Sequence, residues 1–201
     1  MSARPPLRLV LASASPRRHR LLSGLGLDPE VREPQVNESY RPGETPDRHV
    51  ERLALDKAIT VARGRELVVG ADTAVVLDSR LIGKPSDAAA ARETLRALAG
   101  REHLVKTGVA AVVRESRQPP RRATGVETTT VRLTDMTDHD IDWYVSTGEP
   151  LDKAGCYGIQ GAGGLFVESI SGSYSNVVGL PLALTARLVA ELGLDLLAFA
   201  P

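Results

Sequence analysis

Strand-length apolar runs that alternate with helix-start signals constrain this chain more than any other feature of its sequence. Residues 7–12 form such a run, and the serine and proline at positions 15 and 16 then supply an N-cap and a first-turn proline, which together open a helix. The threonine and proline at positions 45 and 46 repeat this signal, and apolar residues follow at helical spacing as far as Val61. This pattern favours an α/β fold.

The rest of the chain continues the alternation, with hairpins between some of the strands. We expect, in order, a strand at Leu67–Gly70 that ends in Ala71-Asp72-Thr73, a hairpin over 75–82, a helix capped by Ser86 that runs to about Leu98, strands at 105–113 and 126–133 joined by the polar loop 114–125, a helix opened by Thr137 and Asp140, a strand near 166–170, and a helix after Pro181 that Gly193 closes. No repeat or long linker divides these elements. We therefore expect one domain over residues 1–201, built on a mixed, twisted sheet with flanking helices.

Composition excludes several classes of protein. The 25 basic and 25 acidic side chains cancel, which argues against a dedicated nucleic-acid binder with a broad basic surface. The single cysteine, Cys156, rules out an internal disulfide framework and a cysteine-based zinc site, and it fits a reducing compartment. No apolar run approaches the roughly 20 residues of a membrane-spanning helix. We expect a cytoplasmic protein that binds neither nucleic acid nor membrane.

The first candidate binding group lies where the first strand turns into the first helix. The sequence contains no phosphate-loop or dinucleotide fingerprint. Ser13, Arg17 and Arg18 can instead converge on an anion, because backbone N–H groups and guanidinium groups meet at such a turn. The alternative is an ordinary helix cap followed by a solvated basic turn.

Two carboxylates are candidates for metal binding or proton transfer. Asp72 directly follows a buried strand, where a carboxylate can bind Mg²⁺ or accept a proton from water. The alternative is an aspartate that merely starts a turn. Glu38, in a polar loop, is a second candidate oxygen ligand, and its alternative is an ordinary solvated side chain.

Two lysines are candidate site residues. Lys57 lies seven residues after Val50 and three after Ala54, so its side chain points with the apolar stripe of its helix. Such a lysine either extends its ammonium group to the edge of the core or reaches into a polar cleft. Lys84, between a glycine and a proline, presents its ammonium group from a constrained loop or is a plain surface lysine. Only four of the 25 basic residues are lysines, at positions 57, 84, 106 and 153.

A glycine-dense segment holds a further candidate. Seven of the 18 glycines lie between Gly155 and Gly179. Gln160 is the only side-chain amide in residues 155–164, and an amide offers both the donor and the acceptor that suit the edge of a base. The alternative is a flexible connector. Taken together, the basic groups, carboxylates and glycines indicate a triphosphate site with a hard metal ion.

Eight blocks of sequence, spread over nearly the whole chain, occur in the order of a known family. They lie at Leu11–Arg18, Leu53–Ala58, Gly70–Thr73, Gly83–Pro85, Thr107–Val109, Thr147–Gly161, Gly172–Tyr174 and Asn176–Pro181. These blocks resemble the Maf family of nucleoside triphosphate pyrophosphatases. The resemblance implies hydrolysis of a nucleoside triphosphate between its α and β phosphates, which gives a monophosphate and pyrophosphate.

The resemblance also implies a fold, a cofactor and an assembly. The fold is an α/β fold like that of the ITPases, with two lobes around a central nucleotide-binding cleft. The cofactor is a divalent cation, usually Mg²⁺, with Mn²⁺ as the alternative, and the family is often homodimeric.

Residue roles are likewise implied by the resemblance. Asp72 matches the proton acceptor that activates water, and Glu38 joins it at the metal. The positions around the phosphates are Ser13, Arg17, Lys57 and Lys84, and those associated with substrate choice are Arg17, Thr73 and Gln160. The triplet Ala71–Thr73, together with Ile159–Gly161, looks like the branch that acts on dTTP and UTP.

Two alternatives stay open beside this expectation. One is a housecleaning pyrophosphatase with broader specificity or a preference for modified nucleotides. The other is a protein without enzymatic activity that regulates septum formation and cell division, since the family is also linked to those processes.

Overall fold

The computed structural model describes residues 7–115 and 119–200. Its helices and strands are, in chain order, β1 (Arg8–Ala12), α1 (Pro16–Ser23), β2 (Glu30–Val31), α2 (Pro46–Val61), β3 (Glu66–Leu77), β4 (Arg80–Ile82), α3 (Ala88–Leu98), β5 (Glu102–Arg114), β6 (Arg121–Leu133), α4 (Asp138–Ser146), β7 (Val167–Ser171), α5 (Tyr174–Val178) and α6 (Leu182–Glu191). Short 3₁₀ turns complete the list: η1 (Glu149–Asp152), η2 (Ala154–Cys156), η3 (Gly161–Phe166) and η4 (Leu196–Phe199).

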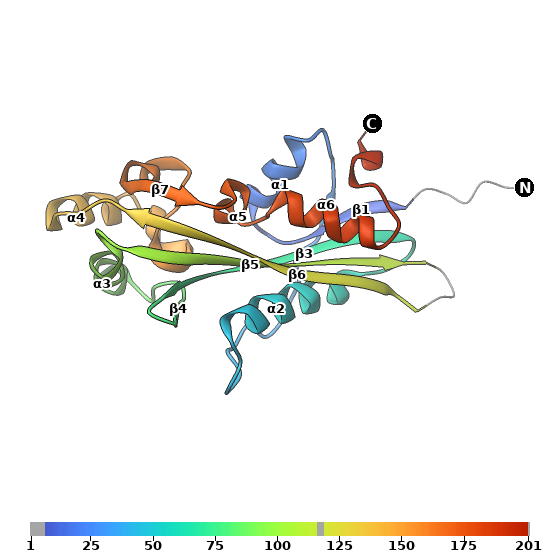
Figure 1. The fold of residues 1–201 in the computed structure, drawn as a ribbon, viewed down its shortest axis with the longest axis horizontal. Helices are drawn as coiled ribbons and strands as arrows, with labels where there is room; N and C mark the ends of the chain where they lie inside the picture. Colours follow the sequence, from blue (N-terminus) through green and yellow to red (C-terminus); the bar gives the residue numbers. More distant parts are fainter. Residues whose placement is uncertain (1–6, 116–118, 201) are drawn as a thin grey trace, which may run out of the picture. The chain divides into compact units, whose positions relative to one another are not determined.

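The strands form one mixed sheet of seven strands, as the sequence predicts (Figure 1). Their order is β2-β1-β3-β5-β6-β7, and β4 pairs with β3 beside this path. β1 pairs in parallel with both β2 and β3, whereas β3–β4 and β6–β7 are antiparallel. The fold class is therefore α/β with a mixed sheet.

The chain divides into two compact units, and each is built from separate stretches of sequence. Unit 1 draws on Met1–Asp72, Thr107–Val126 and Gly179–Pro201. Unit 2 draws on Thr73–Lys106 and Glu127–Val178. Three long strands, β3, β5 and β6, supply residues to both units.

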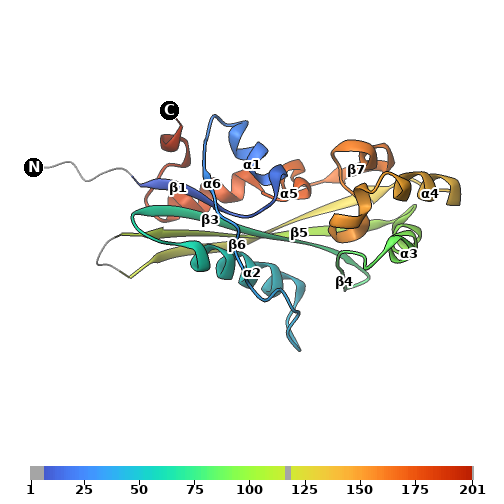
Figure 2. The same ribbon diagram turned by 180° about the vertical axis from the view of Figure 1, so that it is seen from behind.

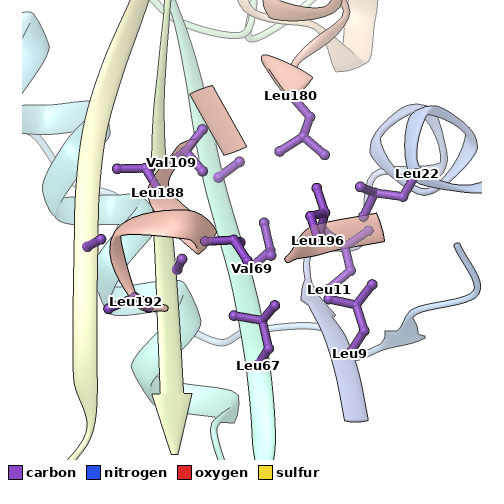
Figure 3. Close-up of a cluster of buried hydrophobic side chains, with 14 of the residues drawn as sticks. Leu9, Leu11, Leu22, Leu67, Val69, Val109, Leu180, Leu188, Leu192 and Leu196 are labelled. Carbon is purple, nitrogen blue, oxygen red and sulfur yellow. The ribbon is translucent and has the colours of Figure 1, made fainter. Parts of the chain in front are cut away.

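In unit 1, helices cover both faces of the sheet. α1 and α6 lie on one face and α2 on the other, as both views show (Figures 1 and 2). Alternate strand residues serve the two faces: Leu67 and Val69 pack in the cluster that includes Leu184 and Leu188 of α6 (Figure 3), whereas Val68 packs with α2. This alternation follows from the two-residue period of a strand.

Two glycines let α2 lie directly on the strands beneath it. A Cβ atom on Gly70 of β3 would stand 2.3 Å from the carbonyl oxygen of Ala54, and one on Gly108 of β5 would stand 2.2 Å from that of Val50. Any other residue would push the helix away. The Thr45-Pro46 start is confirmed, because the Thr45 hydroxyl accepts a hydrogen bond from the Arg48 N–H.

In unit 2, α3 and α4 pack on a second core. Its buried residues include Val75 and Val105 from the strands, Leu95 from α3 and Tyr144 from α4. The predicted start of α4 is confirmed as a capping box, in which Thr137 and Asp140 satisfy each other's backbone N–H groups.

The structure corrects two details of the sequence-based prediction. The strand expected at Leu67–Gly70 does not end at Asp72 but continues to Leu77, because residues 75–77 pair with β4. Asp87, not Ser86, caps α3: its carboxylate accepts a hydrogen bond from the Ala90 N–H at 2.8 Å, and this bond lowers the pKa of Asp87. A carboxylate suits the positive end of a helix dipole better than a hydroxyl.

Several elements are longer than expected or were not expected. β5 ends at Arg114 and β6 begins at Arg121, so the loop between them is shorter than the predicted loop 114–125. Residues 116–118 of that loop lie outside the described residues. The sequence did not predict β2, α5 or the turn η4. The first two have five residues or fewer, too short for a periodic pattern to show.

Candidate functional site

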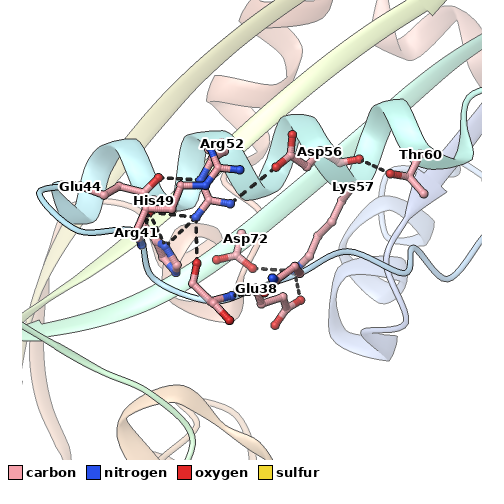
Figure 4. Close-up of polar contacts among 11 residues, drawn as sticks. Glu38, Arg41, Glu44, His49, Arg52, Asp56, Lys57, Thr60 and Asp72 are labelled. Carbon is pink, nitrogen blue, oxygen red and sulfur yellow. Dashed lines mark hydrogen bonds and ion pairs between the residues drawn. The ribbon is translucent and has the colours of Figure 1, made fainter.

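Three of the predicted site residues meet in unit 1. Lys57 on α2 donates from its Nζ to Oδ1 of Asp72 on β3 at 2.6 Å. The same Nζ lies 2.6 Å from Oε1 of Glu38, in the loop before α2. Figure 4 shows the three side chains converging beneath the helix. One ammonium group thus bridges two carboxylates.

The sheet alternation explains why Asp72 meets Lys57. Val68 and Gly70 face α2, so Asp72, two residues further along β3, faces the same helix. Lys57 belongs to the buried stripe of α2, as its spacing predicts, and is only 7% exposed. Asp72 therefore reaches the site from within a strand and not, as expected, from the end of one.

The two ion pairs of Lys57 differ in their surroundings. The side chains of Lys57 and Asp72 are 9% and 12% exposed, whereas that of Glu38 is 56% exposed. A buried pair is strongly coupled, because removal of one partner leaves an uncompensated charge. A pair with a solvated partner is worth at most about 1 kcal/mol. Asp72 is therefore the partner that contributes more to holding the Lys57 ammonium group in position.

The loop that carries Glu38 is fastened to α2 by a second polar cluster (Figure 4). Arg52 donates to both oxygens of Glu44, at 2.6 and 2.9 Å, and to the backbone oxygen of Ser39 at 3.2 Å. The hydrogen bonds from Arg52 lower the pKa of Glu44 to about 2. This cluster could not be predicted from the sequence, because nothing in the residue spacing links an arginine of α2 to a loop glutamate eight positions earlier.

Ser13 and its basic neighbours form a second polar group in unit 1. Ser13 is buried, and its Oγ accepts hydrogen bonds from the Ser15 N–H and from Nη1 of Arg18, both at 3.1 Å. Nε of Arg18 donates to the carbonyl oxygen of Gly179 at 2.7 Å, which ties α1 to the segment before α6. Burial lowers the pKa of Arg18, and the charge of Asp72 opposes that shift. Arg17 is half-buried on α1.

The other predicted residues lie in unit 2. Lys84 is exposed, and the carbonyl oxygen of the preceding Gly83 accepts a hydrogen bond from the Gly155 N–H at 3.2 Å. This bond places the Lys84 loop beside the start of the glycine-dense segment. Gln160 is exposed within that segment, and its Nε2 donates to the Tyr174 hydroxyl at 3.4 Å. Thr73 follows Asp72 on β3.

A known family matches most of the chain. The sequence model described as Maf-like protein matches residues 8–192, which span every candidate residue named above. The chain belongs to the Maf family. Similarity to individual members is also extensive.

Several relatives of this Maf chain carry the name dTTP/UTP pyrophosphatase. The one from Anaeromyxobacter dehalogenans (strain 2CP-C) is 52% identical over 189 residues, which cover 94% of this chain and 96% of the relative. The one from Moorella thermoacetica is 50% identical over 192 residues, covering 94% and 96%. The one from Shewanella oneidensis is 46% identical over 198 residues, covering 94% of this chain and all of the relative.

One solved structure is also similar to this Maf chain. It is the crystal structure of a nucleoside-triphosphatase / dITP/XTP pyrophosphatase from Mycobacterium abscessus, with a TM-score of 0.34 and 15% identity. The match covers 62% of this chain and 74% of that one.

Two observations bear on cofactors and membranes. Within residues 7–115 and 119–200, no three or more His, Cys, Asp or Glu residues gather closely enough to hold a metal ion by themselves. No helix in the described part of this Maf chain is long and apolar enough to cross a membrane.

Proposed function

We propose that this Maf chain hydrolyses dTTP and UTP to the nucleoside monophosphate and pyrophosphate. The observation that carries the proposal is the buried Lys57–Asp72 pair, because the lysine holds one carboxylate in a defined position. The relatives of this Maf chain that are named dTTP/UTP pyrophosphatases supply the substrates. A positioned carboxylate can act as the proton acceptor of a hydrolysis.

In the proposed reaction, Asp72 accepts a proton from the attacking water. The water oxygen forms a bond to the α-phosphorus, and the bond between that phosphorus and the bridging oxygen to the β-phosphorus breaks. Pyrophosphate leaves with the bonding electron pair. Lys57 holds the Asp72 carboxylate in place through its Oδ1 atom.

Glu38 and Asp72 fit the divalent cation that the family implies. Their oxygen donors suit a hard cation such as Mg²⁺ or Mn²⁺, which commonly takes one or two carboxylates plus substrate phosphates. When bound, such a cation offsets negative charge on the phosphates. Removal of divalent cations with a chelator should therefore abolish pyrophosphate release, and added Mg²⁺ should restore it.

The remaining candidates are proposed as substrate ligands. Ser13, Arg17, Lys57 and Lys84 contact the phosphates, and the cations among them offset the charge that develops on the leaving pyrophosphate. Arg17, Thr73 and Gln160 select the base. Gln160 supplies both a donor and an acceptor, which match the imide edge of uracil or thymine.

A panel of triphosphates with a matched pair of variants tests the proposal. Asp72→Asn should keep the fold at reduced stability, because Lys57 loses its buried partner, and should lose about 10²–10⁴-fold in pyrophosphate release, the usual contribution of a general base. Asp28→Asn, which changes an exposed aspartate of the same unit, should behave like the wild type. Near-wild-type turnover by Asp72→Asn would remove this residue from its role.

The same panel separates the alternatives. Turnover of methylated or other modified triphosphates that exceeds turnover of dTTP and UTP would favour a housecleaning role. No hydrolysis of any triphosphate, with or without Mg²⁺, would favour a regulator without enzymatic activity. Sedimentation velocity would test the homodimer that the family resemblance implies.

A further inference from the structure

We propose that Tyr144 and Glu149 are positioning residues that hold both ends of the segment around Gln160 and so aim its amide at the substrate base. This inference rests on the proposed function, because it assigns a means of base selection to that same activity. It concerns unit 2 alone, where all of these residues lie.

The Tyr144–Glu149 pair makes one continuous set of hydrogen bonds. The Tyr144 hydroxyl, on a fully buried side chain of α4, donates to Oε1 of Glu149 at 2.8 Å and accepts from the Gly158 N–H at 3.2 Å. Oε2 of Glu149 accepts from the Ala162 N–H at 2.9 Å, and Oε1 accepts from the Gly163 N–H at 3.1 Å. We call these two side chains the clamp.

The clamp accepts hydrogen bonds from the backbone on both sides of Gln160. Gly158 lies two residues before Gln160, and Ala162 lies two residues after it. The backbone between these points is therefore anchored at each end, while Gln160 itself is exposed. A short segment with two fixed ends presents its central side chain in a restricted range of directions.

The fit between clamp and segment leaves no space for a larger residue at position 163. A Cβ atom on Gly163 would stand 2.3 Å from the Tyr144 hydroxyl oxygen and 2.5 Å from the carbonyl oxygen of Gly158. The glycine lets the backbone approach the tyrosine closely enough for its N–H to reach Glu149. The glycine-dense segment is thus shaped around the clamp and is not a free connector.

The charge state of Glu149 supports the same interpretation. Burial alone would raise the pKa of this carboxyl, but the hydrogen bonds from Tyr144, Ala162 and Gly163 outweigh it and lower the pKa. Glu149 is therefore ionised at neutral pH and acts only as an acceptor. Only the ionised form can accept hydrogen bonds on both oxygens from all three donors at once.

Anchoring of this kind favours binding through entropy. Ordering a backbone residue costs free energy because the chain loses conformational entropy, and glycines lose the most freedom. If the segment were loose, substrate binding would have to supply that free energy. With the clamp in place, the Gln160 amide is already restrained before the base arrives.

The test is the selection of UTP over CTP, which differ at the base edge that Gln160 is proposed to contact. Glu149→Gln keeps the shape of the side chain but replaces one acceptor oxygen with an NH₂ group that faces an N–H or O–H donor. We expect the ratio of kcat/KM for UTP to that for CTP to fall about tenfold or more, the loss expected for a weakened polar contact to the base. The KM for UTP should rise, whereas kcat should change by less than about twofold, because the clamp does not touch the reacting atoms.

Tyr144→Phe removes the other half of the clamp while leaving the ring buried, so it gives a second measurement if Glu149→Gln fails to fold. Glu168→Gln, which alters an exposed glutamate of the same unit, is the matched control and should leave the ratio unchanged. Glu149→Asp keeps the charge and should restore part of the ratio.

The outcomes distinguish the two proposals. Wild-type protein that hydrolyses neither UTP nor dTTP would overturn the proposed function. Wild-type protein that prefers UTP, with clamp variants that keep its preference or lose kcat at unchanged KM, would overturn the positioning role and leave the proposed function standing.

Discussion

At the scale of single residues, Lys57 is a charged group of unit 1 in a buried environment. Its ammonium group is buried and holds two carboxylates, each 2.6 Å away. An unpaired lysine would not remain charged in such a place without a large cost in free energy. The partners of Lys57 therefore determine how well its charged ammonium group is stabilised and where that group lies.

A double-mutant cycle should rank these partners. Lys57→Met combined with Asp72→Asn should give a coupling free energy of about 1–3 kcal/mol, because both side chains are buried. Lys57→Met combined with Glu38→Gln should give less than about 1 kcal/mol, because Glu38 is solvated. Unfolding in urea measures both values, and equal couplings would contradict the ranking.

A second residue-scale prediction concerns the buried pair of His103 and Tyr157 in unit 2. Nε2 of His103 lies 2.7 Å from the Tyr157 hydroxyl oxygen, and burial lowers the pKa of His103 to about 4. The unfolded chain therefore binds a proton between pH 6.5 and 4 that the folded chain does not. Stability falls as the pH falls through this window, by about 1.4 kcal/mol per pH unit from this group.

His103→Gln should remove the contribution of this histidine to the pH dependence of the free energy of unfolding. Urea unfolding at several pH values measures that dependence. His139→Gln, which changes an exposed histidine of α4, is the control and should retain the wild-type slope. A slope unchanged in His103→Gln would show that this histidine titrates alike in both states.

Residue-scale prediction from sequence succeeded where periodicity carried the information. The spacing of Lys57 on its helix placed it on the buried face, and it lies there. Glu38 lies in a loop without a period, so its residue type made it only one candidate oxygen ligand, and its place at the site came from the family resemblance. The contacts of Arg52 with Glu44 and of Tyr144 with Glu149 depend on folded geometry, which no short motif encodes.

At the scale of elements, the close approach of α2 to the sheet sets the geometry of the site. Gly70 lies between Val68 and Asp72 on the face of β3 that meets α2. The helix can approach only because that position lacks a side chain. The distance from Lys57 to Asp72 is therefore controlled partly by an apolar contact with no chemical role.

Gly70→Ala should disturb both stability and activity. The new methyl group would stand 2.3 Å from a backbone oxygen of α2, so we expect a loss of about 1–3 kcal/mol, as for other overpacked cores, together with reduced pyrophosphate release. Gly64→Ala is the control, because a methyl group added there would meet nothing within 4 Å. Equal unfolding midpoints for the two variants would contradict this account of the packing.

Element prediction from sequence worked best at helix starts. The Thr45-Pro46 and Thr137–Asp140 signals marked α2 and α4 correctly, because a cap is a local interaction. The ends of strands were less predictable. The hairpin predicted over residues 75–82 is confirmed, but its first strand is continuous with the strand predicted at Leu67–Gly70, so β3 runs through Asp72 and Thr73 instead of ending there.

At the scale of the whole molecule, the division of the chain into units does not follow its order. Unit 1 needs residues from both ends of the described chain, since Leu9 and Leu11 of β1 share a core with Leu184 and Leu188 of α6. The single domain expected from the sequence remains a prediction, because continuous strands and two compact units are compatible with more than one definition of a domain.

A chain that ends at Val178 should therefore fail to fold cooperatively. It lacks the α6 leucines of the unit 1 core, and each fully buried leucine contributes about 1.5–3 kcal/mol to a total stability of roughly 5–15 kcal/mol. Thermal unfolding followed by circular dichroism measures the loss. A truncated chain with a wild-type transition would contradict the assignment of α6 to this core.

The same arrangement has a consequence for synthesis on the ribosome. Every residue of unit 2 has been made by the time Val178 is added, whereas unit 1 still waits for the residues that follow. Domains generally fold as their segments emerge, so the part that begins with the first strand is the last to be completed. The nascent chain cannot complete the core around Leu9 and Leu11 until Leu184 and Leu188 have been made, and during that interval it depends on speed of synthesis or on chaperones to avoid aggregation.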